Sequence, residues 1–568
     1  MTKTKTCQNC KIKFTIEPED FKFYEKIDVP EPTFCHECQL IRQLASWNER
    51  VLYRRKCDLC NKSIVSIYSS DKPFKVYCNE CWWSDKWDPL DYGRDYNLSR
   101  SFFEQFNELQ KKIPIINLLN KKSINSEYCH DALEMKNCYM IFLAGMCQDC
   151  SYGTYVIGDK DCIDSYKVVD SELCYDSIDC SKCYRLFFCE DCNNCHSSAF
   201  LFDCRNCSDC LGCVGLRSKQ YYIFNKPYSK KDYKEEIKKY NLGSQADLAE
   251  IRKKFSQFNL KFPRKFARIY KSVNVVGDEI YNSKNCFHCF KVDREAEDCR
   301  YVTVAGWNIK DSQDIFNAGL NVSLSYDSVN VITSSKVIFS TSVWSSREIE
   351  YSDYCHNSSN LFGCVSLHNK KHCILNKQYS ELEYKEIVVK IKKQMDRTPY
   401  TDKKGRIYKY GEYFPMELSR FGYNESVAQL YFPLKKEQAL KQGYSWYDKP
   451  KTEYKPTIKA KDLPDNIKDV DNSILKQVIE CKDVNSCAGS GVFRIIPQEL
   501  KFYKKMNLSL PRLCPECRHA EKVKQRNLLK LWKRQCMNKG CSNKFQTTYA
   551  PDRKEIVYCE KCYLKEVG

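Results

Sequence analysis

Cysteine pairs with the spacing C-x-x-C offer the clearest chemistry in this sequence. The chain has 37 cysteines among 568 residues. A structural zinc ion takes four thiolates in a tetrahedron at about 2.3 Å, and one C-x-x-C turn supplies two of them. Four pairs near the N-terminus, with spacers of 24, 18 and 17 residues, therefore predict two zinc sites. The predicted ligands are Cys7, Cys10, Cys35, Cys38, Cys57, Cys60, Cys78 and Cys81.

The last hundred residues repeat this scheme. LKFYKK at 500–505 matches FKFYEK at 21–26, and IVYCEKC at 556–562 matches KVYCNEC at 75–81. An internal duplication of this kind predicts two further sites and about four zinc ions per chain. The predicted ligands are Cys481, Cys487, Cys514, Cys517, Cys536, Cys541, Cys559 and Cys562. The first pair is the least regular, because five residues separate its two cysteines.

Four thiolates per site indicate a structural role. A catalytic zinc keeps an open position beside three protein ligands, whereas these sets leave none. The ions would then contribute folding energy. The alternative for each set is buried, reduced cysteine that packs as a small apolar residue.

One segment carries a family resemblance. The stretch CQNCKIKFTIEPEDFKFYEKIDVPEPTFCHECQLIRQ, residues 7–43, resembles the zinc-ribbon (treble-clef-like) domain. The longer layout is similar to large, cysteine-rich zinc-ribbon proteins of uncultivated bacteria, a group of uncharacterised function. The resemblance implies zinc and a small ribbon fold, and it implies no activity.

The middle of the chain is a second duplication. GCVGLRSKQYYIFNKPYSKKDYKEE at 212–236 matches GCVSLHNKKHCILNKQYSELEYKEI at 363–387, an offset of 151. Short apolar segments recur about every 12 residues upstream of each copy, for example DCSYGTYV at 149 and DCIDSYKV at 161. Such a period predicts a β-solenoid or β-helix. The expected fold is therefore a multidomain, mainly β protein, with a duplicated solenoid between tandem zinc modules.

The dense cysteines from Cys180 to Cys213 are interpreted through the same offset. It places Val331 opposite Cys180, Val343 opposite Cys192 and Ser346 opposite Cys195. A zinc ligand cannot be replaced by valine, so these thiols are predicted to face the solenoid interior. The alternative is an additional metal or redox site, with Cys189, Cys192, Cys204 and Cys207 as its best ligands.

Two other polar or aromatic segments have similar alternatives. His368, His372 and Cys373 could form a ligand set, but solvated loop residues are the favoured interpretation. The tryptophans of CWWSDKW, residues 81–87, are predicted to pack the zinc module onto a solenoid end, with base stacking as the alternative. The aromatic segment 414–440 is either a plug between domains or a peptide-binding surface.

Helices and linkers divide the chain. Amphipathic patterns predict helices over 101–113 and 246–258, and capping boxes start further helices after Ser229 and Ser380. Residues 396–412 and 448–466 are predicted loop and linker. The expected division is a double zinc module (1–91), a helical linker (92–122), solenoid block 1 (123–228), a helical connector (229–268), solenoid block 2 (269–379), a helical or irregular segment (380–470) and a basic double zinc module (471–568).

The charge is concentrated at the C-terminal end. The chain has a formal net charge of +19, and residues 481–568 carry 19 Lys and Arg against 8 Asp and Glu. The segment RHAEKVKQRNLLKLWKR at 518–534 follows the cysteine pair Cys514 and Cys517. It predicts a helix and then a strand that together carry a stripe of basic side chains able to bind phosphates. The predicted nucleic-acid contacts are Arg518, Lys522, Arg526, Lys530, Lys533 and Arg534. Nothing in the pattern distinguishes RNA from DNA.

Three functions are weighed. The leading hypothesis is a non-catalytic, zinc-stabilised binding protein that contacts nucleic acid or a ribonucleoprotein through its basic end. The alternative is a protein-interaction scaffold with purely structural zinc, whose solenoid binds a protein partner. A carbohydrate-active enzyme on a β-helix comes third, because no nucleotide-binding or hydrolase motif is present. Without an apolar run or a signal sequence, we expect a cytoplasmic protein that does not bind membranes.

Overall fold

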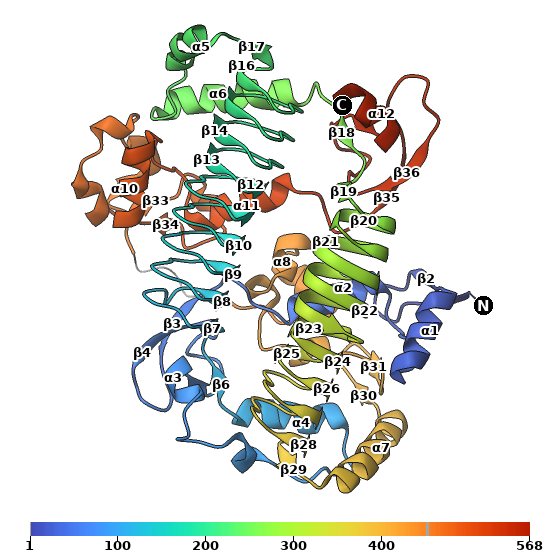
Figure 1. The fold of residues 1–568 in the computed structure, drawn as a ribbon. Coiled ribbons are helices and arrows are strands. Elements are labelled where there is room, and N and C mark those ends of the chain that lie inside the picture. Colours follow the sequence, from blue (N-terminus) through green and yellow to red (C-terminus); the bar gives the residue numbers. More distant parts are fainter. Residues whose placement is uncertain (1, 450–453, 568) are drawn as a thin grey trace.

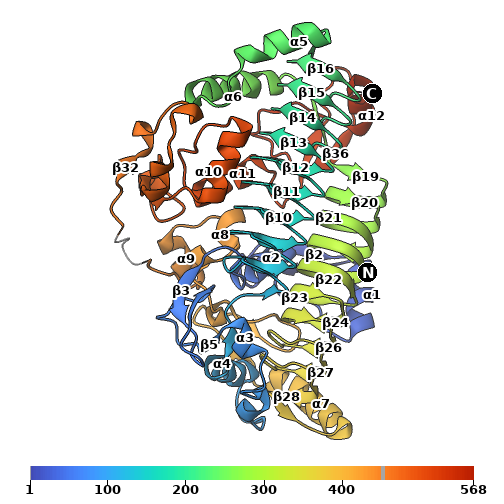
Figure 2. The same ribbon diagram turned by 60° about the vertical axis from the view of Figure 1, so that its left-hand side comes forward.

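Two columns of short parallel strands lie side by side and run in opposite directions through the centre of the molecule (Figures 1 and 2). The structure is a computed structural model that describes residues 2–449 and 454–567. The first column, solenoid 1, consists of β7 (Asn120–Lys121), β8 (His130–Leu133), β9 (Phe142–Gly145), β10 (Thr154–Ile157), β11 (Tyr166–Val169), β12 (Ile178–Ser181), β13 (Tyr184–Phe187), β14 (His196–Ala199), β15 (Ser208–Leu211) and β16 (Gln220–Ile223). The predicted mainly β fold with a duplicated solenoid is confirmed.

Solenoid 2 has the same architecture with longer strands at its start. It consists of β19 (Ile269–Tyr270), β20 (Val273–Tyr281), β21 (Lys284–Arg300), β22 (Thr303–Ser323), β23 (Tyr326–Ile332), β24 (Ser334–Ile338), β25 (Thr341–Trp344), β26 (Arg347–Glu350), β27 (Ser359–Phe362) and β28 (Lys371–Ile374). Each solenoid ends in an antiparallel hairpin, to β17 (Lys226–Pro227) and β29 (Lys377–Gln378). These hairpins end the run of parallel strands.

Each coil of the solenoid is close to 12 residues long. Thr154 pairs with Tyr166, which pairs in turn with Ile178, so equivalent residues stack at an interval of 12. Some coils of solenoid 2 contain one more residue, since Phe290 pairs with Thr303. The predicted period is confirmed, and these longer coils break the constant offset of 151 between the two copies in the early part of solenoid 2.

Corners recur at every third residue, which gives each coil four sides. Asp161, Asp164, Lys167 and Asp170 all have a left-handed backbone, with φ from 50° to 55°. The residue after each corner faces inward, and Cys162 is one example. Asp and Asn tolerate left-handed φ better than other non-glycine residues. The frequent Asp-Cys and Asn-Cys dipeptides thus place a corner residue before an interior residue.

The cysteines from Cys180 to Cys213 line the interior of solenoid 1. Their side chains are at most 3% exposed, and their thiols donate to backbone carbonyls, as Cys195 does to Asn193 at 3.5 Å. In solenoid 2 the equivalent Ser346 makes the same contact with Trp344 at 2.8 Å. The predicted interior thiols are therefore confirmed. Within the described residues, Cys189, Cys192, Cys204 and Cys207 form no cluster that could hold a metal ion.

Helices form at the positions that the sequence predicts. Ser229 and Ser380 cap α5 (Lys230–Glu236) and α7 (Glu381–Arg397) by accepting a backbone N–H three residues on. The two predicted amphipathic helices are α4 (Phe102–Lys112) and α6 (Gln245–Asn259). The loop at 396–412 contains a short hairpin, β30 (Tyr400–Thr401) and β31 (Ile407–Tyr408). Part of the predicted linker at 448–466 lies outside the described residues.

The segment 414–440 is a plug between the solenoids. It contains α8 (Ala428–Tyr431) and leads into α9 (Lys436–Gln442). The Tyr431 hydroxyl lies 3.1 Å from the Tyr166 hydroxyl of solenoid 1 and accepts a hydrogen bond from Lys291 of solenoid 2 at 2.9 Å. One of its two predicted roles, the plug, is therefore the observed one.

Candidate metal centres

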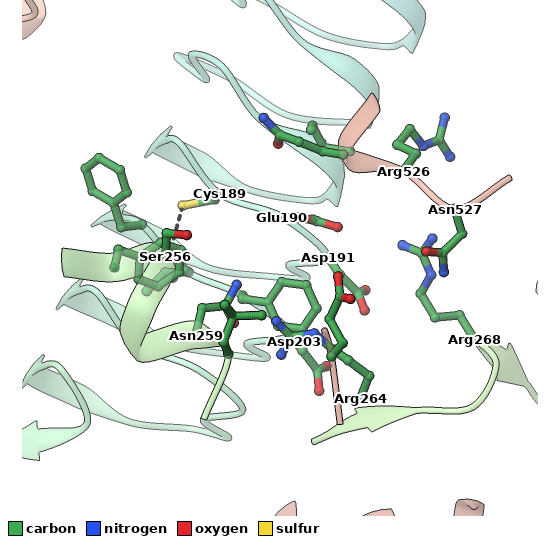
Figure 3. A pocket seen from close by; sticks show the side chains of 18 of the residues that line it. Cys189, Glu190, Asp191, Asp203, Ser256, Asn259, Arg264, Arg268, Arg526 and Asn527 are labelled. Carbon is green, nitrogen blue, oxygen red and sulfur yellow. Dashed lines mark hydrogen bonds between the residues drawn. The ribbon is translucent and has the colours of Figure 1, made fainter. Parts of the chain in front are cut away.

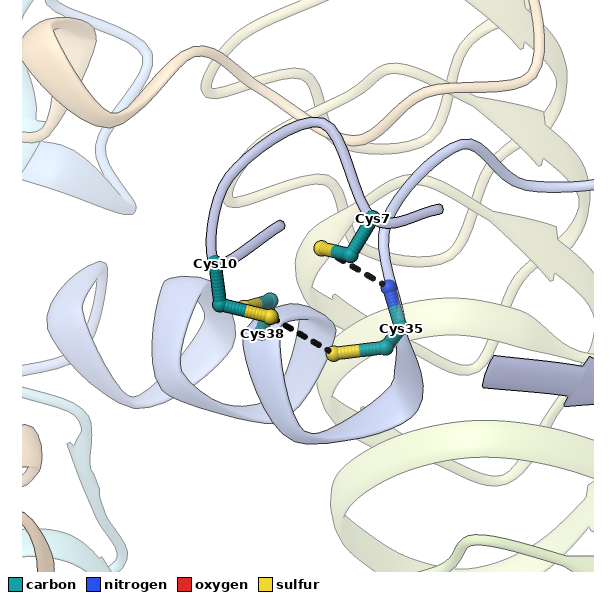
Figure 4. Close-up of side chains that lie close together, drawn as sticks. All are labelled: Cys7, Cys10, Cys35 and Cys38. Carbon is teal, nitrogen blue, oxygen red and sulfur yellow. Dashed lines mark hydrogen bonds between the residues drawn. The ribbon is translucent and has the colours of Figure 1, made fainter. Parts of the chain in front are cut away.

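The first cysteine quartet lies at the N-terminus (Figure 4). Cys7 and Cys10 come from the turn between β1 (Lys3–Thr6) and β2 (Lys13–Ile16), and Cys35 and Cys38 from the start of α2 (His36–Ala45). The Cys10 and Cys35 sulfurs are 3.7 Å apart. Four thiolates around one zinc ion would be separated by about 3.8 Å, since each lies about 2.3 Å from the metal. This quartet therefore has the dimensions of a tetrahedral site.

Three further quartets have the same construction. In each of the four sets the ligand atoms lie within 4.8 Å of one another. The sets are Cys57, Cys60, Cys78 and Cys81; Cys481, Cys487, Cys514 and Cys517; and Cys536, Cys541, Cys559 and Cys562. The structure thus brings together all 16 cysteines that the sequence nominates, including the irregular pair Cys481 and Cys487.

In every quartet, one cysteine sulfur accepts a hydrogen bond from a backbone N–H group. The N–H groups of Cys35, Cys78, Cys514 and Cys559 each donate to a cysteine of the same set at 3.3 Å. Bonds of this kind favour the charged form of a thiol. A side-chain hydrogen bond with the Cys514 thiol, 3.5 Å away, also lowers the pKa of Cys487, to about 5. Closed sets of four thiols suit a soft metal ion and leave it no open position.

The first quartet of each module packs against the solenoid that is farther from it in the sequence. Tyr24, on α1 (Pro18–Ile27), packs against Tyr326 of solenoid 2 with ring centroids 5.4 Å apart. Tyr503, on α10 (Pro497–Met506), packs against Tyr175 of solenoid 1 at the same 5.4 Å. Tyr503 corresponds to Tyr24 in the duplicated module, and Tyr175 to Tyr326 in the duplicated solenoid. The two copies therefore share the contact between module and solenoid as well as the module and the solenoid themselves.

The second quartet of each module extends the start of the other solenoid. β5 (Val76–Tyr77) pairs in parallel with β6 (Ile115–Ile116), just before solenoid 1. In the same way, β37 (Val557–Tyr558) pairs with β18 (Arg264–Lys265), just before solenoid 2. Each module consequently contacts both solenoids. The remaining module elements are β3 (Tyr53–Lys56), β4 (Ser63–Ser66), α3 (Asn79–Trp82), β32 (Ile458–Lys459), β33 (Ile479–Glu480), β34 (Val492–Phe493), α11 (Pro515–Gln525), β35 (Trp532–Gln535), β36 (Lys544–Thr547) and α12 (Glu560–Val567).

Half of the predicted phosphate contacts are buried inside the protein. Arg518, Lys522 and Arg526 are 7%, 4% and 6% exposed. Arg518 lies 2.7 Å from Asp164, and Lys522 lies 2.8 Å from Asp176. These side chains hold α11 against solenoid 1 and do not form an exposed stripe. The predicted phosphate-binding stripe is therefore wrong for these three residues, because their shared helical face meets acidic corner residues of the solenoid that lie far away in the sequence.

The other three predicted contacts lie nearer the surface. Lys530 forms an ion pair with Glu37 of the N-terminal module at 2.8 Å, and both side chains are about half exposed. Lys533 is exposed on β35. The half-buried Arg534 donates to the carbonyl oxygen of Ala550 at 3.3 Å. Of the six predicted side chains, only Lys533 is both exposed and without a hydrogen-bond or ion-pair partner among the described residues.

The tryptophans after Cys81 pack onto solenoid 2, as predicted. Trp82 is fully buried, with ring centroids 5.6 Å from His356 and 5.3 Å from His368. Solvated loop residues were therefore the wrong interpretation of His368 and Cys373. Cys373 is completely buried in the solenoid interior on β28. His368, His372 and Cys373 form no metal-binding cluster among the residues that the structure describes.

Comparisons with known proteins identify no relative in sequence. No protein-family model matches the chain, and no curated protein matches it either. Among solved structures, it is similar to a presumed acetyltransferase from Desulfovibrio desulfuricans G20, with 10% identity and a TM-score of 0.10 over 51% of this chain and 86% of that one. A likeness this small carries no argument about activity. In the described part of the chain, no helix has the length and apolar character needed to cross a bilayer.

Proposed function

We propose that this protein is a non-catalytic scaffold in which four zinc ions hold two β-solenoids together for the binding of a protein partner. The observation that carries the proposal is the crossed docking of the modules. In each module, one quartet packs against one solenoid, and the other quartet lies at the start of the other solenoid. Since a structural zinc site folds its own ligand loops, each ion would stabilise a contact between the two columns.

Zinc is the metal that the donor set favours. Four thiolates with tetrahedral spacing suit Zn²⁺, which has no geometric preference of its own and binds sulfur at about 2.3 Å. The zinc-ribbon resemblance of residues 7–43 supports the same metal. Because every quartet is closed, catalysis at the metal has no coordination position to use.

The proposed partner surface is a polar face of solenoid 2. Parallel strands of a solenoid present long, rigid surfaces that commonly bind other proteins. A shallow groove crosses this face, and its lining includes Thr333, Ser345, Arg347, Asn357 and Lys371. Its two basic side chains would favour an acidic partner surface.

Removal of the metal tests the scaffold. We expect chelation of the purified protein to increase its radius of gyration by small-angle scattering while its β-sheet circular dichroism persists. Return of zinc should restore the compact form. A metal-free protein that stays equally compact would show that the quartets do not hold the solenoids together.

Nucleic-acid binding remains a second candidate, on a different surface from the one first predicted. The C-terminal quartet carries exposed Lys533, Lys539, Lys544, Lys554 and Lys561. Exposed lysines around a compact module can neutralise phosphates, with affinity that falls steeply as salt rises. Fluorescence anisotropy against mixed-sequence RNA and DNA at two salt concentrations tests this candidate. Binding that survives Lys533→Glu and Lys544→Glu together would exclude this surface.

A further inference from the structure

A partly open cavity of about 440 Å³ lies between solenoid 1, α6 and the C-terminal module. Figure 3 shows Ser256 and Asn259 of α6 on one side, and Arg264 and Arg268 on the other. Its volume falls within the range of small-molecule sites, about 300–1,000 Å³. No metal quartet opens into it, so the proposed scaffold role leaves it unexplained.

One part of the cavity is apolar, and the rest is lined by arginines together with several carboxylates. The apolar lining includes Phe188, Phe200, Leu201, Phe202, Phe255 and Leu260. The basic lining includes Arg264, Arg268, Arg526 and Arg553. Mixed linings of this kind orient a ligand by its charged end and bury its apolar end.

Arg264 forms no ion pair with any residue that the structure describes. It is 5% exposed, and its guanidinium stacks 3.8 Å from the centre of the Phe202 ring. Its Nη1 atom is buried without a hydrogen-bond partner. Arg526 adds two more unpartnered donors, Nε and Nη1, although its Nη2 binds Glu279 at 2.9 Å. A buried, unpaired guanidinium is costly, and its planar edge is suited to two oxygens of one anion.

Most of the acidic residues of the lining already have a basic partner, and two of them pair within the lining, Asp176 with Arg252 and Glu555 with Arg553. Asp191 binds Arg205 at 2.7 Å, and Asp203 binds Arg217 at 3.0 Å. Glu190 is the exception, since no described residue forms a hydrogen bond or ion pair with its carboxyl group. Burial raises the pKa of Glu190 to about 7, against the opposing charge of Arg268. Near neutral pH its carboxyl group is therefore partly protonated and can donate a hydrogen bond.

We propose that this cavity binds a small amphipathic anion, a carboxylate or phosphate joined to an apolar group, through Arg264 and Arg526. The anion lies against the free guanidinium edges, and the apolar group lies among the phenylalanines. The site is independent of the scaffold proposal, because it uses neither a zinc ligand nor the groove of solenoid 2.

Titration calorimetry of the full-length, zinc-loaded protein tests the site with benzoate and phenyl phosphate, and with benzyl alcohol as the neutral probe. We expect at least one anion to bind at least 10-fold more tightly than the alcohol. The tighter anion identifies the headgroup. Failure of both anions to bind the folded wild-type protein would overturn the proposal.

Variants locate the binding. Arg264→Gln should weaken it at least 10-fold, whereas Arg294→Gln, an exposed arginine stacked on Trp307 outside the cavity, should change it less than 2-fold. Glu190→Gln should bind at least as tightly as wild type, because it removes a like charge. Ser256→Trp, at an exposed position of α6 that faces the cavity, should block entry while the protein stays folded. Equal affinity in wild type, Arg264→Gln and Ser256→Trp would contradict the proposed location.

Discussion

Lys522 lies 2.8 Å from the carboxylate of Asp176, and Gln43 donates to Asp327 at 2.7 Å in the equivalent place. Lys522 and Gln43 occupy the same position in the two modules, and Asp176 and Asp327 the same position in the two solenoids. The chain was therefore duplicated together with its docking surface. In one copy the contact is an ion pair, and in the other it is a neutral hydrogen bond to a carboxylate.

Charge reversal at Lys522 should undock the C-terminal module. Lys522→Glu places a buried carboxylate against Asp176, and loss of a buried partner of this kind costs about 3–5 kcal/mol. Lys533→Glu, at an exposed position, should change the free energy of unfolding by less than about 0.5 kcal/mol. Urea denaturation of the zinc-loaded proteins measures both values. Similar midpoints for the two variants would contradict the docking role.

Each docking tyrosine should stabilise one module. Tyr24→Ala and Tyr503→Ala remove buried rings that are 2% and 0% exposed, and large-to-small changes of this kind cost about 3–5 kcal/mol. Hydrogen exchange should accelerate in the N-terminal module for the first variant and in the C-terminal module for the second. Tyr454→Ala, at a 69% exposed side chain, serves as the control. Uniform acceleration across the chain would show that the modules do not open separately.

Metal content should separate the quartet cysteines from the interior cysteines. The wild-type protein should bind about four zinc ions, and Cys35→Ser should bind one fewer, because a structural site needs four ligands. Cys195→Ser should keep the full number, since Ser346 already fills the equivalent interior position in solenoid 2. Elemental analysis of the purified variants measures this. A loss of metal from Cys195→Ser would restore the alternative of an additional site.

The contact between the solenoids should weaken as pH rises. Asp131 of solenoid 1 accepts hydrogen bonds from Asn317 at 3.0 Å and Asn330 at 2.7 Å, both in solenoid 2. Burial raises its pKa to about 6, above the ordinary value near 4. A raised folded-state pKa favours the protonated form, so the stability that it contributes is present below pH 4 and is lost as pH rises towards 6 and beyond.

Asp131→Asn tests this directly, because the amide keeps the size of the carboxyl group and cannot ionise. We expect it to stabilise the protein by about 3 kcal/mol at pH 8 relative to wild type, and by less at pH 5. Thermal unfolding at the two pH values measures the difference. Equal effects at pH 5 and pH 8 would mean that the carboxyl group does not titrate in this range.

The spacing of the cysteines was enough to predict the quartets, because each knuckle is a local turn and only the pairing of knuckles is nonlocal. The interior role of Cys180 to Cys213 followed from the internal repeat, since a ligand position would not hold valine in the other copy. A stronger signal was present in the dipeptides Asp-Cys and Asn-Cys, which mark a left-handed corner followed by an inward residue. The three-residue period that they define gives the four-sided coil.

The sequence by itself determined the local and repeated features: the four quartets, the 12-residue coil, the capped helices and the two duplications. These depend on residues close in the chain or on matches between copies. Only the tertiary structure decided that each module bridges both solenoids, that Arg518, Lys522 and Arg526 face acidic solenoid corners, and that Arg264 is left unpaired in a cavity. A charged helical face looks the same whether it meets water or a distant carboxylate, because burial of a charge depends on its partner and not on its own neighbours in the chain.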